Sequence, residues 1–176
     1  SALTIAVKTQ VTGGNPSATD VCYVGMRNAT LATGTFNRRS ITGALNMVVS
    51  SGSTLGQTSG QASAIYVYLI DNAGTLELAV SHALYSENVL VSTTAEGGAG
   101  AADSPTVIYS TTARSNVPLR LIGIMTNTQA TAGTWDTLPS QIQLAPLQGY
   151  KGPTIQKFTS GSGTYNTPAG CVRIRV

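Results

Sequence analysis

The clearest hydrophobic pattern in the chain is a pair of apolar runs on either side of a short turn, from Ala64 to Ser81. In a strand, the first run places three aliphatic side chains on one face and two tyrosines with an isoleucine on the other: Ile65, Val67 and Leu69, then Tyr66, Tyr68 and Ile70. The segment 71–74 (DNAG) favours a tight reversal, because Asp and Asn bond their own backbone and Gly has no Cβ atom. We therefore predict a central β-hairpin that is covered on both faces.

Shorter apolar runs, separated by Gly, Pro and Asn, indicate further strands. The expected ranges are 3–11, 21–26, 35–41, 44–50, 89–92, 106–111, 119–126 and 141–144. Gly123, inside one of these runs, indicates a bulge or a close neighbour. No segment repeats apolar residues with the period of an amphipathic helix, which excludes a parallel α/β fold. The pattern predicts an all-β protein, either an antiparallel β-sandwich or a jelly-roll-like barrel.

The composition changes near residue 147, where Gly and Pro become frequent (QGYKGPTIQKF). We place a boundary near Gly149, so that residues 1–148 form the β-sandwich module. Residues 149–176 then form a linker and the truncated start of a C-terminal domain, with a short β segment. The final VRIRV alternates like a strand that stops part-way, which predicts that the sequence is a fragment of a longer protein.

The composition supports a folded chain with an unusual surface. Hydrophobic residues make up 41% of the sequence, which is enough for a core, whereas charged residues make up only 10%. Soluble domains usually contain roughly 25% charged residues. A surface with so few charges stays soluble through hydroxyl and amide groups or is hidden against neighbouring copies. Viral, secreted and oligomeric β proteins often have this composition, and cytoplasmic metabolic enzymes rarely do.

The formal net charge of +3 does not indicate a nucleic-acid partner, because the basic residues are scattered. A nucleic-acid groove needs clustered cations, preferably with aromatic stacking partners. The closest groups are Arg38–Arg39, interpreted as a solvated bend or an intersubunit ion pair, and Arg173 with Arg175. We also predict no membrane insertion, because no apolar window has the length of a span and no signal peptide opens the chain.

Residue types that carry catalysis are sparse. The single histidine, His82, is interpreted as structural, because Ser81 beside it points to the opposite face of a strand. The acidic residues are spread over the whole chain: Asp20, Asp71, Glu77, Glu87, Glu96, Asp103 and Asp136. The Gly-rich stretch 96–100 lacks the Lys-Ser/Thr and the helix of a phosphate loop, and Asp103 lacks calcium-loop spacing. We therefore predict no catalytic residue, no cofactor and no metal site.

Two cysteines and one tryptophan leave alternatives open. Cys22 and Cys171 have no CxxC spacing for zinc or redox chemistry, and each lies in an apolar context that suits a buried thiol. The sequence does not decide whether they form a disulfide. Trp135 is either a core residue beneath a loop or an exposed aromatic platform for sugar binding.

The C-terminal stretch IQKFTSGSGTYNTPAGCVRIRV resembles the entry to the glycine-rich terminal domain of tail fibres of tailed bacteriophages. The residues that fill the family pattern F-x-x-G-x-G-x-Y-x-T-P-A-G are Phe158, Gly161, Gly163, Tyr165, Thr167, Pro168, Ala169 and Gly170. Upstream, VSSGSTLG (49–56), STTAEGGAGAADSPTVIYS (92–110) and AGTWDTLPSQIQL (132–144) resemble a module of phage fibre and virion-associated proteins. The glycine run of the family is missing here, so an adhesive role of that tip is not carried over.

The resemblance implies a homotrimeric tail-fibre module, a structural or receptor-binding component of the virion that mediates fibre assembly or host attachment. It implies assembly in the bacterial cytoplasm and a place in the virion tail. The implied partners are copies of this chain, other virion proteins and a host surface glycan or protein. Tyr66 and Tyr68 are the expected contact between subunits.

Three alternatives remain open at this point. The first is a carbohydrate-binding β-sandwich that uses Trp135 or exposed tyrosines. The second is a capsid or capsid-decorating protein without catalysis. The third is a capsule-degrading enzyme, which the sparse acidic residues disfavour.

Overall fold

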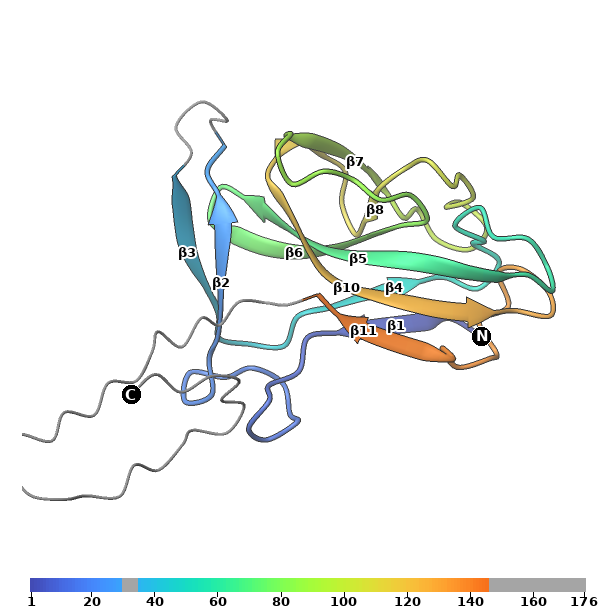
Figure 1. Cartoon of the computed structure of the whole chain (residues 1–176), viewed down its shortest axis with the longest axis horizontal. Helices are drawn as coiled ribbons and strands as arrows, with labels where there is room; N and C mark the ends of the chain where they lie inside the picture. Colours follow the sequence, from blue (N-terminus) through green and yellow to red (C-terminus); the bar gives the residue numbers. More distant parts are fainter. Residues whose placement is uncertain (30–34, 146–176) are drawn as a thin grey trace, which may run out of the picture.

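The computed structural model describes residues 1–29 and 35–145, and this part of the chain contains strands and no helix (Figure 1). The strands are β1 (Leu3–Ala6), β2 (Cys22–Arg27), β3 (Phe36–Ile41), β4 (Asn46–Val49), β5 (Ala62–Asn72), β6 (Thr75–Ser81), β7 (Val91–Ala95), β8 (Tyr109–Ser110), β9 (Arg114–Val117), β10 (Leu119–Thr128) and β11 (Gln141–Leu144). The prediction of an all-β protein is therefore confirmed. The boundary expected near Gly149 and the whole segment 149–176 lie outside the described residues and stay predictions.

The predicted hairpin is formed by β5 and β6, which are central strands of the largest sheet. Its turn has the expected chemistry, because Oδ1 of Asp71 accepts a hydrogen bond from the Gly74 backbone N–H at 2.7 Å. Ala73 and Gly74 both have positive φ angles, 51° and 103°, as tight hairpin turns require. The hairpin prediction is confirmed, including its turn.

The largest sheet has seven strands in the order β11-β10-β5-β6-β8-β7-β9. Its neighbouring strands are antiparallel, except that β7 and β8 run parallel. The two-stranded sheet of β1 and β4 packs against one face of it, and no barrel closes. Of the two predicted architectures the sandwich is therefore the correct one, although its main sheet is mixed rather than wholly antiparallel.

Both faces of β5 are buried, and this chain itself covers both. Ile65, Val67 and Leu69 belong to the larger apolar cluster, which fills the space between the seven-stranded sheet and the β1–β4 sheet. Tyr68 and Ile70 belong to a second cluster on the opposite face. The other buried members of that second cluster are Ala79, Val91, Ile108, Val117 and Leu119. The alternation read from the sequence is confirmed.

Strand β10 is irregular at the predicted place. Its register against β5 shifts between Leu121 and Gly123, which marks a β-bulge. The Leu121 N–H donates instead to Oε1 of Glu87, at 2.8 Å. A Cβ atom at Gly123 would lie 3.3 Å from the carbonyl oxygen of Gln143, so this glycine also has the close neighbour that its position indicated.

β7 spans Val91–Ala95 instead of 89–92, and β1, β8 and β9 also depart from the predicted ranges. β1 ends at Ala6, because its partner β4 is only four residues long and the chain then turns, with the Thr9 N–H bonded to the Gly14 carbonyl at 3.0 Å. β8 covers two residues instead of 106–111. β9 was not predicted, because RSNV has no apolar alternation and only pairing with β7 makes it a strand.

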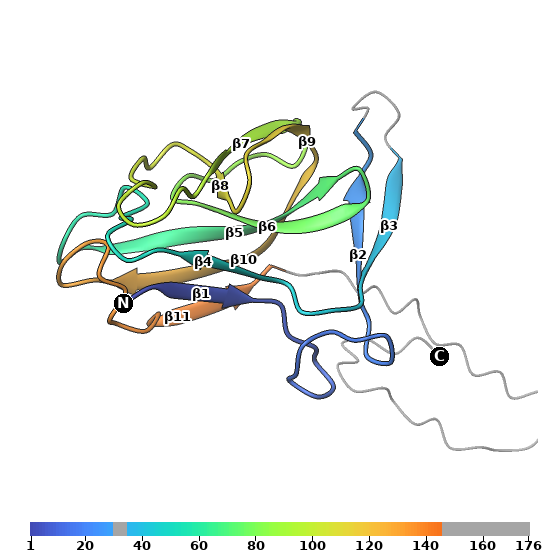
Figure 2. The same ribbon diagram turned by 180° about the vertical axis from the view of Figure 1, so that it is seen from behind.

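The two ends of the sandwich differ. β2 and β3 form a separate two-stranded ladder, called the arm below, which stands at one end beside the β5–β6 turn (Figures 1 and 2). The N-terminus and the loops 50–61, 96–108 and 129–140 lie at the other end, called the loop end (Figure 1). Along the side, β11 is an edge strand whose Ile142 and Leu144 are 67% and 79% exposed.

Candidate binding surface

The arm is a strand pair with one buried and one exposed face. In the ladder, Tyr23 lies opposite Ser40, Gly25 opposite Arg38, and Arg27 opposite Phe36. Residues paired in this way point to the same side of the sheet, so these six residues share one face. We call it the arm face.

The opposite face of the arm attaches it to the sandwich. Val24, Met26 and Ile41 are buried in the larger apolar cluster. The guanidinium of Arg39 binds Asp71 of the β5–β6 turn, with 2.7 Å between Nε and Oδ2, and the Asp71 side chain is almost wholly buried. These contacts fix the arm to the sandwich and so fix the direction of the arm face.

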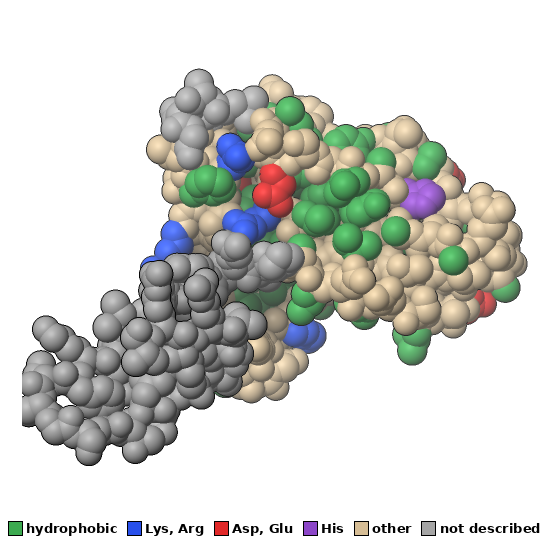
Figure 3. All heavy atoms as spheres, viewed as in Figure 1, with side chains coloured by type: hydrophobic (Ala, Val, Ile, Leu, Met, Phe, Trp, Pro, Cys, Tyr) green, Lys and Arg blue, Asp and Glu red, His purple; other side chains and the backbone are tan. Residues whose placement is uncertain are grey.

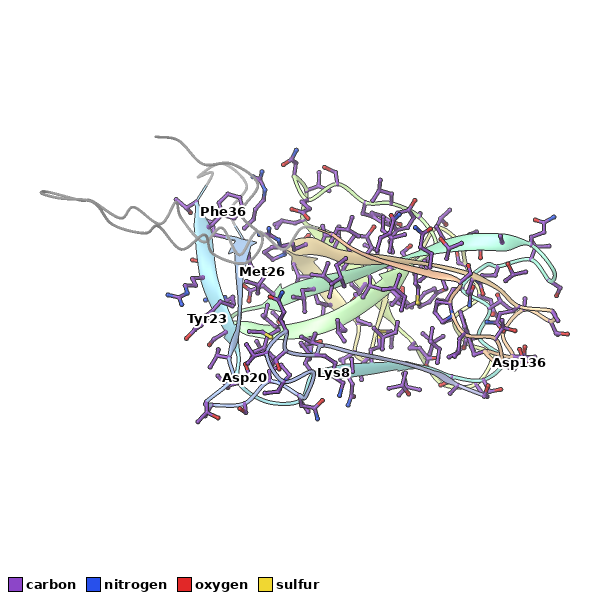
Figure 4. The ribbon with its side chains drawn as sticks, turned by 60° about the horizontal axis from the view of Figure 1, so that its bottom comes forward. Lys8, Asp20, Tyr23, Met26, Phe36 and Asp136 are labelled. Carbon is purple, nitrogen blue, oxygen red and sulfur yellow. The ribbon has the colours of Figure 1, made fainter. Side chains whose placement is uncertain are left out.

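The exposed arm face carries two aromatic rings and two arginines. Tyr23 and Phe36 are each 56% exposed. The guanidinium of Arg38 lies 3.9 Å from the centre of the Tyr23 ring, and that of Arg27 lies 5.2 Å from the centre of the Phe36 ring. Figure 4 shows Tyr23 and Phe36 on the arm, with Met26 on the side of the sandwich. Stacking restricts the long arginine side chains, so the face is partly ordered before it meets a ligand.

Within the described part of the chain, no ion pair neutralises the charges of the arm face. The two ion pairs of the described residues use Arg39 with Asp71 and Arg114 with Glu77. In residues 1–29 and 35–145, no carboxylate pairs with Arg27 or Arg38. The blue side chains visible in Figure 3 lie in the half of the molecule that carries the arm. The arm face is therefore an exposed cationic and aromatic surface.

The interpretation of Arg38–Arg39 as a solvated bend is wrong, because both residues lie in a strand, and the intersubunit ion pair is wrong for Arg39, whose partner is in the same chain. For Arg38 the intersubunit ion pair stays a prediction. Both residues lie within β3, and successive side chains of a strand point to opposite faces. Arg39 therefore turns inward to the carboxylate of Asp71 in the same chain, while Arg38 stacks outward on Tyr23.

Cys22 begins the arm and is a free, half-buried thiol. Burial raises its pKa above the usual value, and the negative charge of Asp20 raises it further. The thiolate is the reactive form of cysteine, so this thiol is a poor nucleophile at neutral pH. Cys171, with which the sequence left a disulfide undecided, lies outside the described residues.

Trp135, one of the expected ligand contacts, is a core residue of the loop end. Only 6% of its surface is exposed, and its indole N–H donates to the Ser53 carbonyl at 2.9 Å. Its backbone has a φ angle of 47°, which is costly for a bulky residue. Burial and the hydrogen bond offset that cost. The first of its two interpretations is correct, and no sugar platform forms at this position.

The tyrosine face of β5 is closed by the chain itself. Tyr68 is fully buried, and its hydroxyl donates to the Ala83 carbonyl at 3.2 Å and accepts from the Tyr85 N–H at 2.9 Å. The expectation that Tyr68 contacts another subunit is therefore wrong, because the segment after β6 folds over it. Tyr66 packs at the border of the same cluster and stays half-buried, so its expected contact stays a prediction.

The loop end is organised around the buried carboxylate of Glu96. Glu96 accepts hydrogen bonds from the backbone N–H groups of Ser50 and Gly98 and from the hydroxyls of Ser50 and Ser53. Asp103 accepts the Thr54 N–H at 2.7 Å in the same region. The Gly-rich stretch 96–100 is thus a loop that is anchored to its own chain through Glu96, while Gly97, Ala99 and Gly100 are exposed.

The remaining acidic side chains are also used within the fold. Asp20 accepts from the Thr12 hydroxyl, Glu87 from the Leu121 N–H, and Asp136 from the Thr134 hydroxyl. His82 is half-buried. Among the described residues, no three His, Cys, Asp or Glu side chains gather as they would around a metal ion.

Sequence reasoning missed Tyr23, Arg27 and Phe36 as members of a site. The alternation in CYVGMR and FNRRSI places them on one face once the two segments are paired, but the sequence alone does not give the register of that pairing. Without the register, the basic residues looked scattered.

No protein-family model, curated protein or solved structure matches the chain. Within the part of the chain that the structure describes, no helix is long and apolar enough to cross a membrane.

Proposed function

We propose that this chain is a structural and receptor-binding component of a bacteriophage virion, a tail-fibre module that mediates fibre assembly or host attachment. The observation that carries the proposal is the arm face, where Tyr23, Phe36 and Arg38 are exposed and Arg27 is half-buried. Among the described residues, neither arginine has a partner carboxylate. Aromatic and arginine side chains are the residue types enriched at the energetic centres of interfaces. The resemblance of the C-terminal segment to tail fibres supplies the setting.

A binding role without catalysis is supported by the use of the acidic residues. The sequence contains seven Asp and Glu residues, and each of them accepts a hydrogen bond or forms an ion pair within the fold. A glycosidase needs two carboxylates that converge on a substrate. Carboxylates that hold loops and turns are poorly suited to that task, which disfavours a capsule-degrading enzyme.

Contact between copies of the chain is best supported at the β11 edge. Ile142 lies opposite Met125 and Leu144 opposite Gly123, so both side chains point to the face that carries the larger apolar cluster. They nevertheless remain exposed, and β11 contains no charge, proline or bulge that would protect an edge strand. This edge replaces the Tyr68 face as the surface that neighbouring subunits of a homotrimer would cover.

Electron microscopy of phage particles that carry this chain tests the proposal. Gold-labelled antibodies raised against the folded chain are expected to decorate the tail or its fibres. Decoration of the head would instead support a capsid or capsid-decorating protein, and particles without label would overturn a virion role. Pre-adsorption of the antibodies with purified chain is the control.

A further inference from the structure

The arm face has the chemistry of an oxyanion-binding surface. Arg27 and Arg38 are diagonal neighbours across the ladder, which brings their Cβ atoms to about 7–8 Å or less. Gly25, which lies opposite Arg38 and two residues before Arg27, adds no side chain to this face. At the edge of β2, Nη1 of Arg120 donates to the Gly25 carbonyl at 2.5 Å, so a third guanidinium lies beside the same glycine.

Each stacked guanidinium keeps N–H groups that a ligand can use. The guanidinium carbons of Arg38 and Arg27 lie over the Tyr23 and Phe36 rings, and no ion pair of the described residues uses the N–H groups at the edges of these planar groups. Carboxylate, sulfate and phosphate oxygens match these edges in a two-pronged arrangement. The aromatic rings supply apolar surface next to the charge, on which the C–H face of a sugar ring packs.

The size of the face favours a polymer over a folded protein. Six residues on two paired strands present a patch on the order of 200 Å². A standard protein interface buries roughly 800 Å² on each partner, so a globular partner would need much more surface than the arm face offers. An extended polymer can bind through a patch of this size, because only a few of its repeating units need to contact the protein at one time.

We propose that the arm face binds an anionic polysaccharide, through guanidinium contacts to its acidic groups and ring contacts to its sugars. The inference rests on the proposed function, because a module that faces the host surface meets polysaccharide there. It moves the sugar contact from Trp135, which is buried, to Tyr23 and Phe36, which are exposed.

Binding of the full chain to defined polymers tests the inference. The probes are immobilised polysialic acid, which carries a carboxylate on every sugar, dextran sulfate, neutral dextran and single-stranded poly(dT). We expect binding to the two anionic polysaccharides, no binding to neutral dextran, and weakening as salt is added. The inference is overturned if the chain binds neither of the two anionic polysaccharides. It is also overturned if the chain binds neutral dextran as tightly as it binds them.

Variants that remove the same charge at different places distinguish binding at the arm face from general attraction between a cationic protein and an anionic polymer. Arg38→Gln is expected to weaken binding to polysialic acid roughly tenfold, because it removes charge-assisted hydrogen bonds. Lys8→Gln removes one positive charge away from the arm face and is expected to change binding less than twofold. Tyr23→Ala is expected to weaken binding several-fold without a change of charge. Equal losses for Arg38→Gln and Lys8→Gln contradict a defined site.

Two further measurements keep the outcome clear. Each variant is compared with wild type by thermal unfolding, and if Arg38→Gln does not fold, Arg38→Lys replaces it, with an expected several-fold loss of affinity. Tighter binding to poly(dT) than to polysialic acid would assign the face to nucleic acid and overturn the inference. Labelling of virions by antibody does not depend on any of these results, so the proposed function is tested separately.

Discussion

The hydroxyl group of Tyr68 connects the segment after β6 to the sheet that this segment covers. Its ring is fully buried against Ile70 and Leu119, and its hydroxyl bonds to the backbone of Ala83 and Tyr85. Burial raises the pKa of Tyr68 to about 12, from an ordinary value of 10.0. The folded chain therefore keeps this proton at pH values where an unfolded chain has already lost it.

We predict from this shift that stability falls as the pH rises from 10 to 12. In that interval the unfolded state releases the Tyr68 proton and the folded state does not, so each pH unit lowers the free energy of unfolding by about 1.4 kcal/mol. Urea unfolding at several pH values measures the slope. In Tyr68→Phe the contribution of this group to the slope is expected to disappear, while stability at pH 7 falls by about 1 kcal/mol.

Tyr23→Phe is the matched control, because it removes a hydroxyl from the exposed arm face. It is expected to leave stability at pH 7 within about 0.5 kcal/mol of wild type, as surface substitutions usually do. Equal slopes in wild type and Tyr68→Phe would contradict the assignment of the shifted group.

At the scale of residues, some roles were readable from the sequence and others were not. Asp71 as a turn residue and Gly123 at a bulge follow from local rules, because each role depends on a few neighbouring residues. Glu96 bonds to Ser50 and Ser53, more than 40 positions away, and Trp135 also bonds to Ser53. Such contacts form only when loops that are distant in sequence meet in the fold, so no local sequence pattern predicts them.

At the scale of elements, the arm depends on one ion pair at its junction with the sandwich. Asp71 is 4% exposed and receives the Arg39 guanidinium, while its other oxygen holds the Gly74 N–H. Loss of the guanidinium would leave a buried carboxylate without its cation, which is far costlier than loss of a surface pair.

We therefore predict that Arg39→Ala destabilises the chain by about 2–4 kcal/mol in urea unfolding. The double variant Arg39→Ala with Asp71→Asn is expected to recover part of this loss, because the amide oxygen keeps the turn bond without a buried charge. Hydrogen exchange of the amides in β2 and β3 is expected to accelerate more than exchange in β10. A double variant less stable than Arg39→Ala would contradict the explanation.

The strands, too, divide into those that local sequence predicts and those that depend on distant neighbours. The β5–β6 hairpin was predicted because its apolar alternation and its turn are both local. β9 and the parallel pairing of β7 with β8 were not, because polar RSNV and a two-residue strand owe their conformation to a neighbouring strand. The cover of the Tyr68 face was missed for the same reason, since sequence alone does not say which segment folds back.

At the scale of the whole molecule, the uncovered β11 edge predicts self-association. Light scattering of the full chain at micromolar concentration is expected to give three times the chain mass of 18.1 kDa. Ile142→Thr with Leu144→Thr keeps strand propensity and removes apolar surface, so it is expected to shift the chain toward monomer.

Val48→Thr is the matched control for this edge, because Val48 is also an exposed aliphatic residue but lies on β4. It is expected to leave the mass of the assembly unchanged. A wild-type chain that is monomeric at micromolar concentration would contradict self-association, whatever the variants do.

The directions of the outer strands decide how the sandwich carries mechanical tension. Ser1 bonds to the carbonyls of Thr134 and Trp135 at the loop end, whereas β11 runs from the loop end toward the arm end and continues to Ala145 (Figures 1 and 2). Pulling Ser1 and Ala145 apart therefore draws β1 and β11 along their own axes in opposite directions. Ladder hydrogen bonds stand perpendicular to antiparallel strands. The bonds of each outer ladder would share the load in shear instead of opening one after another, so the described part of the chain is built to resist tension between these two points.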